Sequence, residues 1–336
     1  MLTPRENYLL AVHHETPERV PIMGVDSYVT GFGAGFGPSF EKGTPNHPVD
    51  GFGVRWIFPA SGSGAAIPAP GEFILDAENI VDWKKLVTFP NVNDFDWETE
   101  AKNDFSKFDR TERLVEFGSG NGPFERIAAL MGFEEALLAM QLEPEAFYEL
   151  IDAIVDYKIE VVEKVAQYYK PDLYTSYEDI ATERNLFMSP DSYRALIKPQ
   201  TKRYYDAVKA FDMIPMQHTC GRCEDIIPDL IEIGTNGWSS AQPSNDIAGL
   251  LQKHGHRFNI VGGFDSTGHP GSDKATEEEI AAEVRRCFDS YGPYQGYIFY
   301  GFRLVNSLVL EGRAVEMAKV LEPAMEFSKA MAKSGA

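Results

Sequence analysis

The chain has 336 residues, of which 43% are hydrophobic and 12% aromatic, and a formal net charge of -20 from 51 acidic against 31 basic side chains. This negative charge repels phosphate backbones and therefore argues against nucleic acid as a partner. Three cysteines are too few for a disulfide framework and fit a reducing, cytoplasmic location. We expect no secretion and no membrane association, because no apolar signal segment opens the chain and no run reaches about 18 consecutive apolar residues.

Local signals predict the first elements. Thr3 and Glu6 form a capping box around Pro4, so a helix should begin there. The apolar runs 20–25 and 54–58 are typical of strands and are predicted to be the first two strands of the fold.

Three segments between the predicted elements are interpreted as loops or surface excursions. Residues 26–53 combine glycines, prolines and aromatic residues, and a loop of this length inside a compact domain usually serves a function or covers a site. Residues 77–111 are acidic and aromatic, and we interpret them as a surface excursion. The glycine-rich run 118–124 opens a helix but lacks the spacing of a phosphate-binding loop.

From residue 113 onward, short apolar strands alternate with helical patterns. Six further strands are predicted, at 113–117, 172–177, 213–216, 237–241, 258–262 and 296–300. Helices are predicted at 144–169, 189–211, 246–254, 276–288 and 314–331, each with a start or stop signal.

Eight strands that alternate with helices predict an α/β fold, a (β/α)8 TIM barrel. The alternative is a doubly wound open sheet, which the missing dinucleotide-binding fingerprint weakens. We expect one domain over residues 1–336, with 1–111 as an N-terminal extension carrying the first strands and 112–336 as the remainder of the barrel.

The stretch 213–225 contains the most specific pattern in the chain. His218 and Cys220 lie two residues apart at the end of a predicted strand, so their side chains share one face. A neutral imidazole and a thiolate side by side make half of a tetrahedral zinc site, and Cys223 follows one turn later. A lone His or Cys is usually a packed core residue. Three such residues crowded at one strand end instead indicate a metal or catalytic role.

Other polar residues follow the predicted strands, where barrels carry their catalytic groups. Glu178 and Asp179 follow the fourth strand and Asp265 the seventh, and we take these three acids as catalytic candidates. Further polar residues at strand ends are Gln242, Asn245, Arg303 and Asn306. Each of these residues alone could cap a helix or brace a loop, and Asn245 and Asp246 have the pattern of helix caps.

Several short motifs are spread over nearly the whole chain: Thr3-Pro-Arg-Glu6, Arg19-Val-Pro21, Gly122-Pro-Phe-Glu125, Glu178-Asp-Ile180, Met188-Ser-Pro190, Lys198-Pro199, His218-Thr-Cys-Gly221 and Gly262-Gly-Phe-Asp265. With these motifs the chain resembles the uroporphyrinogen decarboxylase superfamily. The His-x-Cys-Gly piece resembles the branch of corrinoid-linked methyltransferases. This resemblance implies a barrel fold in which His218 and Cys220 bind Zn²⁺. It also implies methyl transfer between a small molecule and the cobalt of a corrinoid.

The sequence departs from the family pattern at two places. The decarboxylases carry an Arg-Gln-Ala-Gly-Arg stretch after the first strand, whereas residues 25–33 contain no arginine, which argues against tetrapyrrole decarboxylation. The thiol methyltransferases carry a third ligand, a cysteine, after the last strand, where this chain has Gly301-Phe302-Arg303. The substitutes that we consider for the third ligand are Cys223, Glu178 and Asp265, in that order. Cys287 is interpreted as a core residue.

The expected function is zinc-dependent exchange of a methyl group with a separate corrinoid protein. The small molecule is a methoxylated or methylamine-type donor, or a thiol acceptor. The corrinoid must come from a partner protein, because the Asp-x-His-x-x-Gly pattern of a cobalamin-binding domain is absent from the sequence. We expect this partner to dock on the loop from Tyr28 to Phe52, unless that loop only closes the barrel mouth.

Two other functions remain open at this point, a carboxy-lyase of the uroporphyrinogen decarboxylase type and a non-catalytic corrinoid-binding barrel. The identity of the methyl donor and acceptor is not specified by the residues, and a homodimer is compatible with them.

Overall fold

The computed structural model describes residues 2–31, 41–59, 66–106, 108–303 and 310–334. Asn306, one of the strand-end candidates, therefore lies outside the described residues, as does the segment 32–40 of the expected docking loop. No helix among the described residues is both long enough and apolar enough to cross a membrane.

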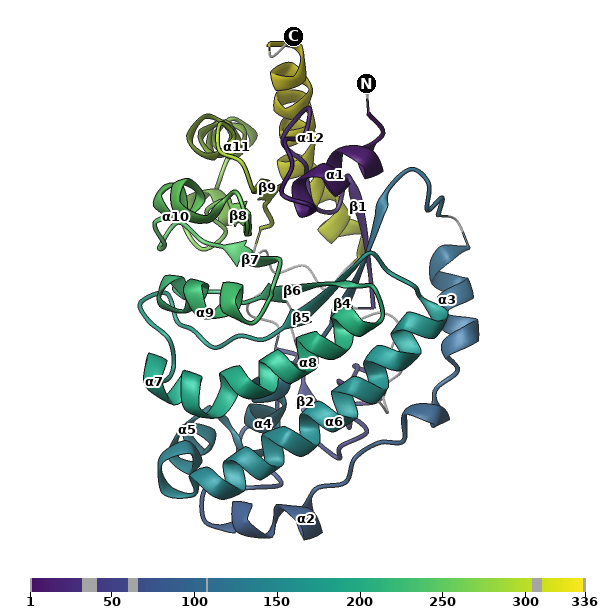
Figure 1. The fold of residues 1–336 in the computed structure, drawn as a ribbon, viewed down its shortest axis with the longest axis vertical. Coiled ribbons are helices and arrows are strands. Elements are labelled where there is room, and N and C mark those ends of the chain that lie inside the picture. Colours follow the sequence, from purple (N-terminus) through teal and green to yellow (C-terminus); the bar gives the residue numbers. More distant parts are fainter. Residues whose placement is uncertain (1, 32–40, 60–65, 107, 304–309, 335–336) are drawn as a thin grey trace.

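A curled, parallel seven-stranded sheet lies at the centre of the molecule (Figure 1). In spatial order its strands are β1 (Ser27–Thr30), β4 (Leu114–Ser119), β5 (Leu173–Tyr177), β6 (Ile214–His218), β7 (Gly237–Ala241), β8 (Asn259–Gly263) and β9 (Tyr297–Tyr300). The segment before β1 approaches the opposite edge, because Ile22 forms a parallel bridge with Phe299. The chain is thus α/β, with a sheet that curls in the manner of a barrel.

Helices connect the strands and cover the outside of the sheet. They are α1 (Pro4–Val12), α2 (Trp83–Leu86), α3 (Trp97–Phe105), α4 (Pro123–Met131), α5 (Phe133–Leu142), α6 (Pro144–Tyr168), α7 (Pro190–Ser192), α8 (Lys198–Ala210), α9 (Ile227–Glu232), α10 (Ile247–His254), α11 (Glu277–Tyr291) and α12 (Leu310–Ser334). Figure 1 shows the long helices α6 and α8 side by side, and α11 packs against α12. The capping boxes at Thr3 and Thr276 form as expected.

The predicted strands from residue 113 onward all form within a few residues of their expected bounds, whereas the first two strand predictions are confirmed only in part. The run 20–25 contributes only the bridge at Ile22, because the chain turns there: the Val25 and Asp26 N–H groups donate to the Ile22 carbonyl. The run 54–58 forms β2 (Trp56–Ile57), which pairs antiparallel with β3 (Ile67–Pro68) and not with the main sheet.

Inside the sheet, an apolar layer fills the end where the strands begin. Leu114, Leu173, Met216, Val261 and Ile298 come from five strands and pack together with residues of α1. Contacts at the strand beginnings place this helix: the Arg5 guanidinium binds Asp172 at 2.6 Å, and the Arg5 N–H donates to the Glu112 carbonyl. Helix α1 therefore closes the amino ends of the strands.

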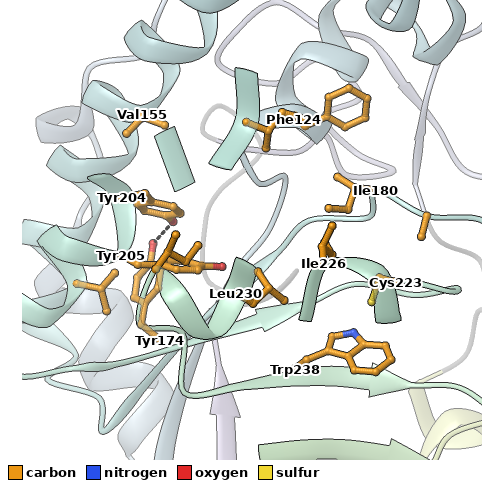
Figure 2. Packing of buried hydrophobic residues seen from close by; sticks show 14 of the residues in the cluster. Phe124, Val155, Tyr174, Ile180, Tyr204, Tyr205, Cys223, Ile226, Leu230 and Trp238 are labelled. Atoms are coloured by element: carbon orange, nitrogen blue, oxygen red, sulfur yellow. Dashed lines mark hydrogen bonds between the residues drawn. The ribbon is translucent and has the colours of Figure 1, made fainter. Parts of the chain in front are cut away.

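A second apolar region lies between the sheet and its outer helices, and Figure 2 shows part of it. Tyr174 of β5 and Tyr204 of α8 are both fully buried there, and their hydroxyl groups are hydrogen-bonded at 2.8 Å. Pairing the two hydroxyls satisfies polar groups that would otherwise be costly to bury.

Buried ion pairs hold the described part of the N-terminal extension against the helices. Arg126 of α4 binds Asp50 at 2.7 Å, and Lys158 of α6 binds Glu41 at 2.8 Å. Both basic side chains are completely buried. Asp50 also accepts a hydrogen bond from the Trp56 indole at 3.0 Å. Because charges removed from water need close partners, this network fixes the extension to the fold.

Candidate metal centre

Three potential metal ligands meet where β5 and β6 end. Asp179, His218 and Cys220 each offer one ligand atom, and the three atoms lie within 4.8 Å of one another. The Cys220 Sγ and His218 Nε2 atoms are 3.5 Å apart. The strands are parallel and in register, with Tyr177 opposite His218, so the residues after both strands emerge at the same edge.

His218 is held by its two neighbours in the interior. Its Nδ1 lies 3.2 Å from the Ser239 hydroxyl of β7, and its ring stacks on Tyr177 with centroids 4.3 Å apart. Burial lowers the pKa of this histidine, although the nearby Asp179 charge opposes that effect. A neutral imidazole whose Nδ1 is engaged presents Nε2 to the Cys220 sulfur, which is the form that binds metals.

The Cys220 thiol lies in surroundings that favour its protonated form when no cation is bound. Burial and the negative charge of Asp179 raise its pKa to about 12. A divalent cation at this position would supply the missing positive charge and reverse the effect, since coordination deprotonates a thiol. The three side chains therefore have the chemistry of a metal site.

Backbone contacts fix the loop that carries Cys220. The Cys220 N–H donates to Asp179 Oδ1 at 2.7 Å, which joins two of the three ligands directly. Gly221 follows with φ of 88°, and a Cβ at this position would collide with the Thr182 carbonyl. Only glycine combines this backbone conformation with so close an approach.

The loop after β7 supports the same turn from the other side. Gln242 accepts a hydrogen bond from the Gly221 N–H at 2.8 Å, and Asn245 accepts one from the Cys223 N–H at 3.1 Å. Asn245 also donates to the Gly221 carbonyl at 2.9 Å. Asp246 caps α10 as expected, whereas Asn245 serves as a brace of the ligand loop.

Glu178, the acid next to Asp179, points elsewhere. Its carboxylate accepts hydrogen bonds from the Phe124 and Glu125 N–H groups, at 2.8 and 3.3 Å, and so caps the start of α4. Burial raises its pKa to about 8. The structure does not bring Glu178 into the ligand group. It uses this carboxylate to anchor a helix to the end of β5.

Two further candidates also lie outside the ligand group. Cys223 is fully buried in the apolar cluster, and Figure 2 draws it with Ile226 and Trp238. Burial raises the pKa of its thiol well above the usual range, which suits a core residue. Asp265 accepts a hydrogen bond from the Gly268 N–H at 2.8 Å and stabilises the turn after β8.

The residues after β9 contribute no ligand within the described range. Arg303 is buried and binds Glu316 of α12, and it donates to the Pro270 carbonyl at 3.3 Å. This arginine therefore connects the loop after β9 to neighbouring segments. Cys287 is buried in the core, as the sequence predicted.

Sequence reasoning named Asp179 as a catalytic acid but did not include it among the candidates for the third ligand, although it is the residue that lies beside His218 and Cys220. The signal was present, because β5 and β6 are adjacent and Asp179 lies two residues beyond the strand position opposite His218. It also missed Glu125 and Lys42, which lie near Asp179. Burial raises the pKa of Glu125 well above its usual range, and the charges of Asp179 and Glu178 add to the effect. Burial lowers the pKa of Lys42, which lies 5.0 Å from the centre of the Trp56 ring.

Comparison with known proteins places this site in a family. The profile of the family described as uroporphyrinogen decarboxylase (URO-D) matches residues 106–300, more than half of the chain. Among solved structures, the chain is similar to a methyltransferase from Methanosarcina mazei, with 15% identity, coverage of 97% of this chain and 99% of that chain, and a TM-score of 0.68. This similarity shows a shared fold over almost the whole length.

A second solved structure, an N-terminally His-tagged D-allulose 3-epimerase from Methylomonas sp., is 14% identical, covers 70% of this chain and 92% of that chain, and has a TM-score of only 0.37. No curated protein matches the sequence. The profile match includes β4 to β9 and all three candidate ligands. The chain belongs to the uroporphyrinogen decarboxylase family.

Proposed function

We propose that the protein is a zinc-dependent methyltransferase that exchanges a methyl group with a separate corrinoid protein. The observation that carries the proposal is the convergence of Asp179, His218 and Cys220 within 4.8 Å at the carboxyl ends of two parallel strands. Membership of the family and the fold shared with a methyltransferase support it. We further propose that the sheet is a complete (β/α)8 barrel, with the segment around Ile22 as its eighth strand, and that the enzyme is cytoplasmic.

The ligand set suits zinc better than a hard cation. Zinc takes nitrogen, sulfur and oxygen ligands in tetrahedral sites, and its bonds of roughly 2.0–2.3 Å place neighbouring ligand atoms roughly 3.3–3.8 Å apart. The 3.5 Å separation of Cys220 Sγ and His218 Nε2 falls in this range. Three protein ligands leave one position for a substrate, as in catalytic zinc sites.

Each residue has a separate task in this proposal. A zinc ion held here would act as a Lewis acid toward a bound thiol or methoxy group. Ser239 and Tyr177 orient the His218 ring. Asp179 balances the charge of the site and holds the backbone of Cys220. Gln242 and Asn245 keep the ligand loop in place, and Glu178 keeps α4, with Glu125 in its first turn, beside Asp179.

The electrostatics of the site argue against the alternative carboxy-lyase. Glu125, Glu178 and Asp179 surround the strand ends, and Lys42 is the only basic group among the described charges that act on Glu125. A polycarboxylate substrate would meet repulsion in such surroundings. The ligand group likewise disfavours a non-catalytic barrel, because holding the Cys220 loop requires the Asp179 carboxylate but neither the imidazole nor the thiol.

Metal analysis of the purified protein tests the proposal. We expect about one zinc ion per chain, lost in Cys220→Ala but retained in the matched control Cys287→Ala, which removes a buried thiol of α11 that is outside the ligand group. Methyl transfer to or from a corrinoid protein, followed by visible absorbance, should disappear only in the first variant. Wild-type protein that binds no zinc after metal loading, or a Cys220→Ala variant with full occupancy, would refute the assignment.

A further inference from the structure

A carboxyl group lies inside the sheet, below the ligand group, and no step described so far uses it. Glu116 of β4 is 3% exposed, and its strand neighbours are Val29 and Leu173. Side chains alternate along a strand, so Glu116 shares a face with Leu114, which belongs to the apolar layer above α1. Glu116 is therefore the first polar residue above that layer on β4.

Only one of the two oxygen atoms of the Glu116 carboxyl group has a hydrogen-bond partner among the described residues. The Thr175 hydroxyl donates to Oε1 at 2.6 Å, whereas Oε2 is buried and accepts no hydrogen bond from the described part of the chain. No ion pair to Glu116 exists among the described residues either. Burying an acid without a cation is costly, and such groups in native proteins usually serve a function.

Tyrosine side chains lie near this carboxyl group. Burial raises the pKa of Tyr177, Tyr300 and Tyr8, and the charge of Glu116 adds to the effect on each. Tyr177 and Tyr300, at the carboxyl ends of β5 and β9, remain partly exposed, whereas Glu116 is buried.

The same residues connect Glu116 to the ligand group. Thr175, its hydrogen-bond donor, lies two residues before Tyr177, and Tyr177 stacks on His218. Tyr177 and Tyr300 each lie within electrostatic reach of both Glu116 and Cys220. Both rings therefore lie between the buried carboxyl group and the ligand group, where a small molecule with a few atoms between its two ends would contact both.

We propose that Glu116 binds the protonated amino group of the small substrate, whose reacting end lies at the Asp179, His218 and Cys220 group. The inference rests on the proposed function and adds the substrate class: a short-chain primary amine. A free carboxylate oxygen beside aromatic rings is the surrounding that an ammonium group favours. A neutral ether offers no positive charge to the carboxylate, and a carboxylate or sulfonate would be repelled.

Four probes with a common methoxy end separate these classes: 2-methoxyethylammonium, 2-methoxyethanol, 1,2-dimethoxyethane and methoxyacetate. Binding of each to the purified full-length protein is measured by calorimetry, with and without added zinc. We expect the ammonium compound to bind at least about tenfold more tightly than the other three, the difference typical of a hydrogen bond between charged groups. The ring protons of Tyr300 should show nuclear Overhauser contacts to the methylene groups of the bound ammonium compound.

Variants then test the residue itself. In Glu116→Gln the preference for the ammonium compound should vanish, whereas Glu116→Asp should keep part of it. The exposed Glu183→Gln serves as the control and should bind as the wild type does. Equal binding of the neutral and ammonium probes, binding of none of the four, or an unchanged preference in a folded Glu116→Gln variant would each overturn the inference.

The relative affinities of the four probes for the wild-type protein test the substrate class even if Glu116→Gln does not fold. The outcome is also separable from that of the proposed function. Preferential amine binding by protein that transfers no methyl group even after zinc loading would support Glu116 as the amine site and refute the methyltransferase. Zinc-dependent methyl transfer with no preference for amines would do the reverse.

Discussion

The Cys220 backbone N–H donates a hydrogen bond of 2.7 Å to the Asp179 carboxylate, so that two candidate ligands from neighbouring strands position one another. Asp179 thus has a structural task, which is to hold the loop, and an electrostatic one, which is to bring negative charge to the sulfur and imidazole. The two tasks depend on different properties of the same side chain, and a conservative substitution can separate them.

Asp179→Asn should weaken zinc binding and leave the fold intact. The amide oxygen can still accept the Cys220 N–H, but the ligand charge is lost, so zinc affinity should fall by at least about tenfold, as the loss of an orienting partner alone can produce. Competition with a chelator measures the affinity, and thermal unfolding of the zinc-free protein checks the fold. Equal zinc affinity in the variant would remove Asp179 from the ligand set.

Gly221→Ala should damage the ligand loop more than the same substitution at another glycine with positive φ. Gly24 has φ of 81°, and a Cβ added there would meet nothing within 4 Å, whereas a Cβ at Gly221 would meet the Thr182 carbonyl. Both variants should lose about 1 kcal/mol through backbone strain. Only Gly221→Ala should also lose zinc. Chemical denaturation and metal content measure the two effects, and equal zinc content in both variants would contradict the expectation.

Glu116 should make stability depend on pH. Burial raises its pKa from 4.5 to about 7, so the folded protein holds this proton more tightly than the unfolded chain. Its contribution is fully present below about pH 4.5 and is lost as pH rises toward 7, a change on the order of 3 kcal/mol. Glu116→Gln does not titrate there. The wild type should therefore lose stability relative to this variant between pH 4 and 8.

Urea unfolding of both proteins at several pH values measures that difference, and Glu183→Gln provides the baseline for an exposed carboxylate. A difference between wild type and Glu116→Gln that stays constant over this range would mean that Glu116 is paired with a cation in solution.

The buried ion network should account for much of the stability of the N-terminal extension. Glu41→Gln leaves Lys158 buried without a counter-charge, and loss of one partner of a buried pair costs about 3–5 kcal/mol. The exposed pair of Lys84 and Glu149 provides the matched control, and Glu149→Gln should change stability by less than about 1 kcal/mol. Denaturant midpoints compare them, and similar effects in both variants would argue against a bracing role.

The docking expectation for the loop from Tyr28 to Phe52 can now be restricted. Its described part from Glu41 onward is fixed by ion pairs, so a deletion that tests docking should fall between Gly31 and Glu41. Such a deletion should raise the apparent KM for the corrinoid protein alone, while zinc content and thermal stability stay unchanged. Unchanged kinetics toward the partner would leave the loop as a cover of the barrel mouth.

The sequence predicted the later strands well, because each is a short apolar run between clear helix signals, as with β6 before His218. It failed where the decisive information is not local. The run around Trp56 has a strand pattern, but nothing in it specifies a partner, and the residue pairs with Pro68 outside the main sheet. In the same way, the sequence after β5 does not indicate which of its two acids caps a helix and which lies beside His218 and Cys220. The structure gives the first position to Glu178 and the second to Asp179.

Sequence reasoning misjudged two further residues, Cys223 and Glu116, for a similar reason. Cys223 was a plausible ligand by spacing, but the turn at Gly221 directs its side chain into the apolar cluster. Glu116 was overlooked because it lies in an otherwise apolar strand, where a single acidic residue suggests a side chain that faces solvent. Only the curvature of the sheet turns that face inward and gives the carboxyl group a place in the interior.

Helix α1 closes one end of the sheet with Tyr8, Ala11 and Val12, and this closure has a kinetic consequence for the proposed enzyme. Small molecules must enter and leave at the opposite end, where the ligand group lies. A corrinoid protein that covers this end would trap whatever has already bound. Substrate must then bind before the partner and product must depart after it, so turnover becomes ordered, and dissociation of the two proteins can limit its rate.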